Sequence, residues 1–128
     1  MSLPTEKVAG IGGIFFRVRD PEKMAVWYRE HLGIDAPDGH AEFPWRDEQR
    51  PDEGGRTTWA LFPDNTDYFG AARPAFMINY RVANLARMLA QLREQGVTIE
   101  KAEDYDYGKF AWITDPEGNR IELWEPAG

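Results

Sequence analysis

Apolar and polar residues alternate near the start of the chain, and a helical pattern follows directly. Every second position is apolar over residues 14–18, which predicts a half-buried strand. Asp20 followed by Pro21 is typical of a helix start, because aspartate accepts hydrogen bonds from the first turn and proline fits its first position. The apolar residues then recur at helical spacing until Gly33, a residue that commonly ends a helix.

The same strand and helix pattern returns 64 positions later, with Asn84 as the predicted cap and Gly96 as the predicted stop. The identical pairs are Ile14/Ile78, Arg17/Arg81, Val18/Val82, Met24/Met88, Arg29/Arg93 and Glu30/Glu94. These matches fall in register with the caps and glycines, so we interpret the chain as an internal duplication.

Shorter strand patterns follow each predicted helix. They cover residues 41–45, 57–62, 97–101, 110–114 and 120–125, with a mobile loop expected at 46–56 and a hairpin turn at 115–119. We therefore predict one domain over residues 1–128, made of two βαβββ modules. The first module covers approximately residues 8–62, a linker covers 63–74, and the second module covers approximately 75–126.

Charge and composition exclude several classes of function. With a net charge of −7, the chain lacks the basic surface that binding to nucleic acid or to an anionic membrane needs. It contains no cysteine, which excludes disulfides, thiolate metal sites and a cysteine nucleophile. No apolar run approaches membrane-spanning length and the first residues lack the apolar core of a signal peptide, so we expect a cytoplasmic protein.

The opening RVRDPEKMAVWYREHLG and the ending DPEGNRIELWEP resemble the vicinal oxygen chelate superfamily, which contains glyoxalase I, bleomycin resistance proteins and extradiol dioxygenases. The resemblance covers nearly the whole chain. It implies an α+β fold in which the two tandem modules form curved mixed sheets around a cleft, with the helices outside. It also implies a small-molecule ligand in that cleft and a homodimer.

Strand alternation within that fold assigns side chains to the cleft. The candidate ligand-binding residues are Phe15, Arg17, Phe62, Met77, Asn79, Arg81, Trp112, Glu122 and Trp124. The aromatic members could stack on a flat ligand, although aromatic residues of sheets more commonly belong to a core. The resemblance to glyoxalase I implies that Arg17 holds a carboxylate of the ligand.

Metal-using relatives carry ligands at four inward positions, which correspond here to Gly13, Ala60, Met77 and Glu122. Glycine and alanine offer no ligand atom, and methionine is too soft for an oxygen- and nitrogen-rich divalent site. A catalytic metal typically needs about three protein ligands, so we predict no metal and no other cofactor.

Three roles stay open for Glu122. It could belong to a structural network with Arg17, Arg81 and Arg120, anchor a ligand beside an arginine that binds an anionic group, or act as the catalytic proton-transfer group.

The leading functional hypothesis is a metal-independent protein that binds a small organic molecule. The alternative is a glyoxalase I-like lyase or isomerase that acts on a small carbonyl or thiol adduct, with a dioxygenase disfavoured because iron needs two histidines and a carboxylate. The third hypothesis is a module with a purely structural role as a partner, in which the protein's own side chains fill the cleft.

Overall fold

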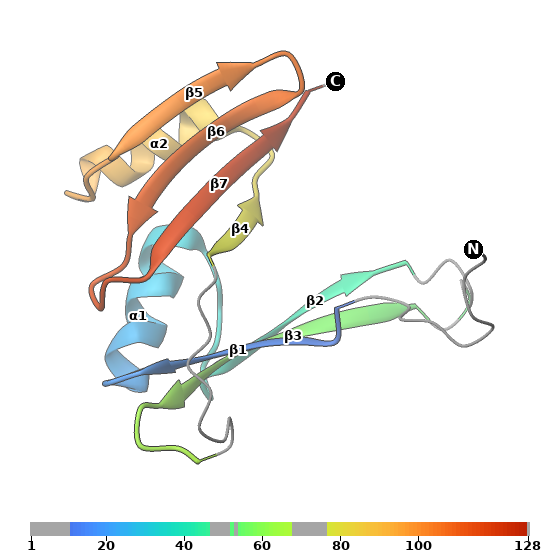
Figure 1. The fold of residues 1–128 in the computed structure, drawn as a ribbon, viewed down its shortest axis with the longest axis vertical. Coiled ribbons are helices and arrows are strands. Elements are labelled where there is room, and N and C mark those ends of the chain that lie inside the picture. The colour runs from blue at the N-terminus through green and yellow to red at the C-terminus, as the bar shows by residue number, and fades with distance from the viewer. Residues whose placement is uncertain (1–10, 47–51, 53, 68–76, 128) are drawn as a thin grey trace, which may run out of the picture. The chain divides into compact units, whose positions relative to one another are not determined.

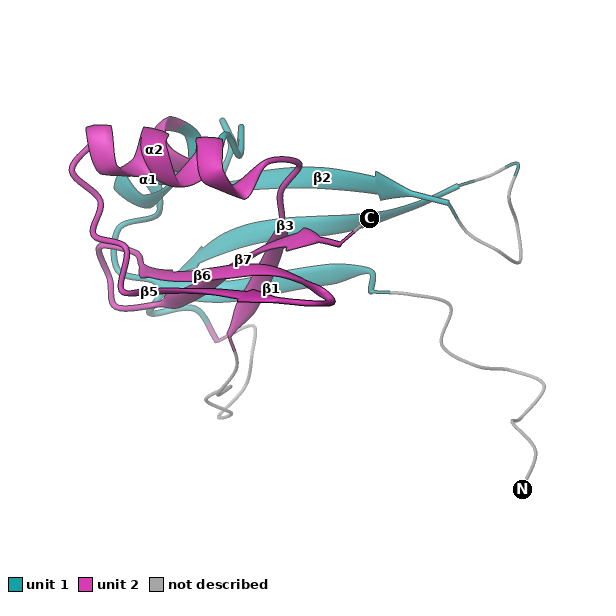
Figure 2. Cartoon of the chain, turned by 90° about the horizontal axis from the view of Figure 1, so that it is seen from above, with its two compact units in different colours: residues 1–29, 33–66 teal, residues 30–32, 67–128 magenta. Residues whose placement is uncertain are grey.

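The computed structural model describes residues 11–46, 52, 54–67 and 77–127, and the chain forms two compact units (Figures 1 and 2). One unit comprises residues 1–29 and 33–66, and the other comprises residues 30–32 and 67–128. The elements in chain order are β1 (Gly13–Val18), α1 (Pro21–Leu32), β2 (His40–Trp45), β3 (Gly55–Pro63), β4 (Ile78–Arg81), α2 (Leu85–Glu94), β5 (Lys101–Tyr105), β6 (Gly108–Thr114) and β7 (Arg120–Pro126).

The first unit contains a three-stranded mixed sheet in the order β1-β3-β2. β3 pairs in parallel with β1 and antiparallel with β2. Helix α1 covers one face, where the ring of Tyr28 meets Trp59 at 4.9 Å and Phe16 at 6.1 Å between centroids. Phe16, Tyr28 and Trp59 are buried, as the alternation of the first strand requires, and form the core of this unit.

The second unit contains a four-stranded mixed sheet in the order β4-β7-β6-β5. β4 and β7 are parallel, and the other two pairs are antiparallel. Helix α2 packs on β6 and β7, and the residues that it covers are fully or almost fully buried. They are Ala111, Ile113, Ile121 and Leu123 on the strands and Leu85, Leu89 and Leu92 on the helix.

Both helices begin at the caps predicted from the sequence. The Asp20 side chain accepts a hydrogen bond from the Lys23 backbone N–H at 3.1 Å, and Asn84 accepts one from Arg87 at 3.0 Å. Gly33 has a φ of 69° and ends α1 in the left-handed conformation that glycine adopts without strain.

The hairpin that joins β6 to β7 is organised by one buried carboxylate. Asp115 accepts hydrogen bonds from the backbone N–H groups of Glu117 and Asn119, each at 2.9 Å, and from the Asn119 side chain at 2.8 Å. This aspartate turn confirms the predicted hairpin and fixes the register in which Thr114 faces Arg120.

Two details differ from the sequence prediction. β5 begins at Lys101, so the strand predicted over residues 97–101 was placed too early. The helix-ending turn uses residue 97, whose N–H bonds to the Leu92 carbonyl, and regular pairing begins where Lys101 faces Trp112. In the described part of the first module, β2 and β3 follow the helix at the two predicted segments, and a third strand of the βαβββ pattern is not among its described elements.

Part of the predicted loop at 46–56 and part of the predicted linker at 63–74 lie outside the described residues. β3 begins at Gly55 and ends at Pro63. The last two residues of the predicted loop and the first residue of the predicted linker therefore belong to this strand. None of the helices in the described ranges is long and apolar enough to cross a membrane.

Candidate functional site

In each unit, the sheet face opposite the helix carries the candidate residues; we call it the helix-free face of that sheet. On the first sheet, Phe15 is in register with Ala60, and Arg17 is in register with Phe62. The rings of Phe15 and Phe62 pack at 5.4 Å between centroids with a tilt of 49°. The register thus brings two predicted ligand-binding aromatics together on this face, and both are half-buried.

The Phe15 ring covers the glycine that stands at the first metal position. A Cβ added at Gly13 would lie 2.6 Å from Cζ and 2.7 Å from Cε1 of Phe15. Carbon atoms at these distances clash, so a side chain at position 13 would require the phenyl ring to move. Ala60, the next of the family's metal positions, is buried in the same sheet.

β2 places two further polar residues on the same face, beyond those predicted from the sequence. His40 is in register with Ala60 and Glu42 with Thr58, and directly paired residues point to the same side. The Thr58 hydroxyl donates to the Glu42 carboxylate at 2.9 and 3.0 Å. The alternation in HAEFPW would have found these residues if the segment had been treated as a strand from its first residue.

Glu122 lies in the middle of the helix-free face of the second sheet. It is in register with Asn79 on β4 and with Trp112 on β6, and the Asn79 amide donates a hydrogen bond of 2.8 Å to its carboxylate. The carboxylate is half-buried, and one amide donor stabilises its charge without neutralising it.

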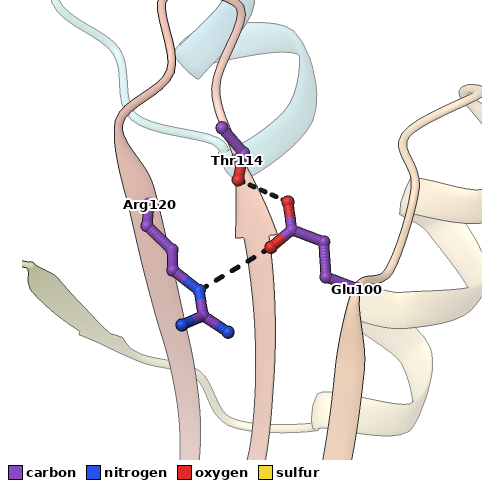
Figure 3. A network of polar contacts seen from close by, with 3 residues as sticks. All are labelled: Glu100, Thr114 and Arg120. Carbon is purple, nitrogen blue, oxygen red and sulfur yellow. Dashed lines mark hydrogen bonds and ion pairs between the residues drawn. The ribbon is translucent and has the colours of Figure 1, made fainter.

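The arginines of this face are engaged elsewhere. Arg120 forms an ion pair with Glu100 at 3.6 Å, and Glu100 also accepts a hydrogen bond from the Thr114 hydroxyl (Figure 3). Arg81 lies over the ring of Trp124, with its guanidinium carbon 5.7 Å from the ring centroid. The predicted carboxylate–arginine network around Glu122 is therefore replaced by the Asn79 amide in the described part of this unit.

Five aromatic rings gather on this face and on the adjoining β5–β6 turn, and we call them the aromatic row. They are Tyr105, Tyr107, Phe110, Trp112 and Trp124. The segment from Glu103 to Phe110 covers the end of β5, the connecting turn and the start of β6. The aromatic row depends on cross-strand register, which the sequence alone does not supply.

Trp124 lies directly against a glycine. A Cβ added at Gly108 would lie 2.6 Å from the indole Nε1 of Trp124 and 3.0 Å from the Glu125 carbonyl oxygen. The indole thus fills the space that a larger residue at position 108 would take, and this contact fixes one end of the aromatic row.

The other predicted residues lie as follows. Arg17 is half-buried on β1, and Met77, the residue before β4, is 42% exposed. Among the residues that the structure describes, there is no group of three or more histidine, cysteine, aspartate or glutamate side chains arranged to hold a metal. The residue types at the family's metal positions, with Phe15 over Gly13, do not fit a divalent ion.

Comparison with known proteins identifies the family. The model of the Glyoxalase/Bleomycin resistance protein/Dioxygenase superfamily matches residues 10–123. No curated protein matches the chain.

Several solved structures share the fold. A superfamily member from Sphaerobacter thermophilus is 24% identical, with a TM-score of 0.62 over 92% of this chain and 98% of that one. The antibiotic-binding protein TnmS3 from a Streptomyces species is 22% identical, with a TM-score of 0.65 over 95% and 99%. A lactoylglutathione lyase from Agrobacterium tumefaciens is 15% identical, with a TM-score of 0.63 over 94% and 96%.

The duplicated strand–helix pattern, the mixed sheets and the match over residues 10–123 agree with one another. The chain belongs to the Glyoxalase/Bleomycin resistance protein/Dioxygenase superfamily.

Proposed function

We propose that this protein binds a small organic molecule without a divalent metal, in the manner of the antibiotic-binding branch of its superfamily. The superfamily contains enzymes, the glyoxalases and dioxygenases, as well as bleomycin resistance proteins, so membership alone leaves the two functions open. The structural neighbours include an antibiotic-binding protein and a lyase, and at their low identity they support the fold and not the activity.

The observation that carries the proposal is the Phe15 ring over Gly13. Gly13 and Ala60 offer no ligand atom, and the space in front of Gly13 is filled by hydrocarbon. Glu122 alone cannot hold a metal tightly, because catalytic sites typically need about three protein ligands. What these positions offer instead is apolar surface, which suits the body of an organic molecule.

The helix-free face of the second sheet offers polar contacts of its own to a ligand. Asn79 and Glu122 form one hydrogen-bonded pair, in which the carboxylate can still accept from a ligand donor. Arg81 is exposed and supplies a cation beside Trp124. Trp112 and Trp124 are half-buried, so each offers part of its ring to a ligand.

Metal dependence of binding tests this proposal. Purified protein is treated with EDTA, and its melting temperature is measured with a panel of small aromatic and aliphatic molecules in the presence and absence of Ni²⁺, Zn²⁺ and Mn²⁺. We expect at least one organic molecule to raise the melting temperature without added metal, because a ligand that binds only the folded state stabilises it. Stoichiometric metal that resists EDTA, or binding that requires metal, would contradict the proposal.

The alternative is a glyoxalase I-like lyase in which Glu122 transfers a proton. The central position of Glu122 and its contact with Asn79 favour this role, since an amide orients the carboxylate without fixing a proton on it. The test is turnover of the hemithioacetal of methylglyoxal and glutathione, with and without added Ni²⁺ or Zn²⁺. The lyase hypothesis requires that the natural chain is active and that Glu122→Gln abolishes this activity. The free energy of unfolding of the variant should stay within about 1 kcal/mol of that of the natural chain.

A homodimer is the assembly that we propose, as the superfamily resemblance implied. Sedimentation velocity over a range of protein concentrations measures it directly, and a single monomeric species throughout the range would refute it.

A further inference from the structure

The aromatic row is centred on Phe110, whose ring lies near four others. Its centroid is 6.2 Å from Trp112 and 6.4 Å from Trp124, with interplanar angles of only 15° and 17°. The rings of Tyr105 and Tyr107 lie 5.9 and 5.8 Å away, and they stack on each other at 5.3 Å with an angle of 6°. Three neighbouring rings with nearly parallel planes suit a flat partner, since aromatic pairs prefer offset stacked or edge arrangements.

The outer part of the row is exposed, unlike an aromatic core. Tyr107 is 68% exposed and Tyr105 is 42% exposed, whereas Trp59 and Tyr28 in the first unit are each 1% exposed. Neighbouring exposed aromatics are costly in water and commonly mark a binding surface.

Three cations stand over the indole rings. Arg81 is 5.7 Å from the centroid of Trp124, and Lys101 and Arg120 are 5.6 and 5.9 Å from that of Trp112. Cations at this distance are attracted by the negative face of the ring. Each indole therefore has at least one cation over its ring, although the chain as a whole carries a net charge of −7.

The cations differ in their carboxylate partners. Lys101 pairs with Glu103 at 3.4 Å, and Arg120 pairs with Glu100 at 3.6 Å. Arg81 has an indole as its neighbour and forms no ion pair with a carboxylate in the described part of the chain. Its guanidinium can therefore pair with an anionic group of a ligand, and arginine does so with two parallel hydrogen bonds.

Cross-strand register orients such a ligand. Arg81, Trp124 and Phe110 follow one another across β4, β7 and β6, and Glu122 lies one row away, opposite Asn79 and Trp112. The Glu122 carboxylate repels an anion placed near Trp112, so the anionic group is favoured at the Arg81 end. Glu103, which is in register with Phe110, is paired with Lys101, and the more distant acidic residues are screened beyond about 10 Å at moderate salt.

From this geometry we infer that the aromatic row binds a flat aromatic anion, with the ring system over Trp124 and Phe110 and the anionic group at Arg81. The inference rests on the proposed function and specifies the chemical class of its ligand. It also assigns binding to Tyr105, Tyr107 and Phe110, which flank the residues chosen from the sequence.

Isothermal titration calorimetry with three matched probes tests the ligand class. The first probe, 2-naphthoate, has a flat ring system and a carboxylate. Cyclohexanecarboxylate keeps the charge without the aromatic ring, and 2-naphthalenemethanol keeps the ring without the charge. We expect 2-naphthoate to bind at least about tenfold more tightly than either control, since each control removes one of the two interactions.

Variants assign the interaction to residues. We expect Arg81→Gln to weaken 2-naphthoate binding by about tenfold, the usual loss for one charge-assisted contact, and to leave 2-naphthalenemethanol unaffected. Phe110→Leu and Tyr107→Leu should weaken both aromatic probes, and the exposed Tyr107 can be changed without loss of the fold. The matched controls are Arg87→Gln on α2 and Phe43→Leu on β2, which should bind as the natural chain does.

Each result separates the ligand class from the proposed function. If 2-naphthoate fails to bind while another molecule of the thermal-shift panel binds without metal, the ligand class is wrong and the proposed function stands. Equal affinity for cyclohexanecarboxylate would also overturn the inference. The inference would also be overturned if the ring variants dissociated a dimer without changing the affinity for the probes, because the aromatic row would then be a contact between two copies of the chain.

Discussion

The two sheets share one strand scheme but differ in the residues on their helix-free faces. In each sheet the first strand of the module pairs in parallel with the last, and a helix covers one face. On the first sheet, the Phe15 ring covers Gly13 and packs against Phe62. On the second sheet, a carboxylate bound by an amide lies beside the aromatic row and its cations.

The internal repeat shows which face the fold itself constrains. Ile14/Ile78 and Val18/Val82 are identical pairs on the helix side, where close packing limits the choice of residue. On the other side, Arg17 and Arg81 are also identical, but Gly13 corresponds to Met77 and Phe15 to Asn79, which differ in size and polarity. We infer that the duplicated scaffold keeps an arginine on each helix-free face and leaves the positions around it open to specialisation.

The largest effect is expected where the aromatic row is fixed on the second sheet. Gly108→Ala places a Cβ against the Trp124 indole and the Glu125 carbonyl, and backbone cannot move aside as a side-chain end can. We expect a loss of about 2–3 kcal/mol in the free energy of unfolding, typical of overpacking at a rigid site. Urea unfolding measures it, with Lys109→Ala as the control on an exposed neighbour.

An unchanged urea midpoint for Gly108→Ala would show that Trp124 is loosely held, and the two sheets would then be alike in this respect.

A smaller effect is expected at Gly13, the glycine that an aromatic ring covers on the first sheet. Gly13→Ala clashes with the far end of the Phe15 side chain, which can rotate, so we expect a loss of about 1 kcal/mol. In a Phe15→Leu background the ring is absent, and the same substitution should cost less. A double-mutant cycle by urea unfolding measures this coupling, and strict additivity would exclude the proposed contact between position 13 and the ring.

The smallest effect is expected from the charged edge shown in Figure 3. The side chains of Arg120 and Glu100 are 53% and 38% exposed, and exposed pairs contribute little because water screens them. Arg120→Gln should lower the free energy of unfolding by at most about 0.5 kcal/mol. Thermal unfolding at low and high salt tests it, and a loss several times larger would mean that this edge is part of the structural support of β7.

The sequence predicts the duplicated architecture because its signals are local. Caps at Asp20 and Asn84, a glycine after the first helix and an aspartate turn at Asp115 each act within a few residues. Strand alternation also places Glu122 correctly on the face opposite the helix, since Ile121 and Leu123 are buried beneath α2.

The composition of the site depends on non-local pairing and could not be predicted in the same way. His40 and Glu42 join the first sheet's helix-free face only through their register with β3. Arg120 shares a strand with Glu122, yet it pairs with Glu100 from the segment before β5. Because Arg120 lies close to Glu122 on the same strand, the sequence suggested it as the partner of Glu122. The partner is instead Asn79 on the neighbouring strand.

The parallel pairing of β4 with β7 has a consequence for the order of folding. β5, β6 and β7 are consecutive antiparallel neighbours, whereas Asn79 and Glu122 are 43 residues apart. Closing the longer loop costs more chain entropy, so the three-stranded meander should form before β4 docks. Asn79 and Arg81 would then reach Glu122 and Trp124 in the final step of refolding, and pulse-labelled amide exchange would detect late protection of β4.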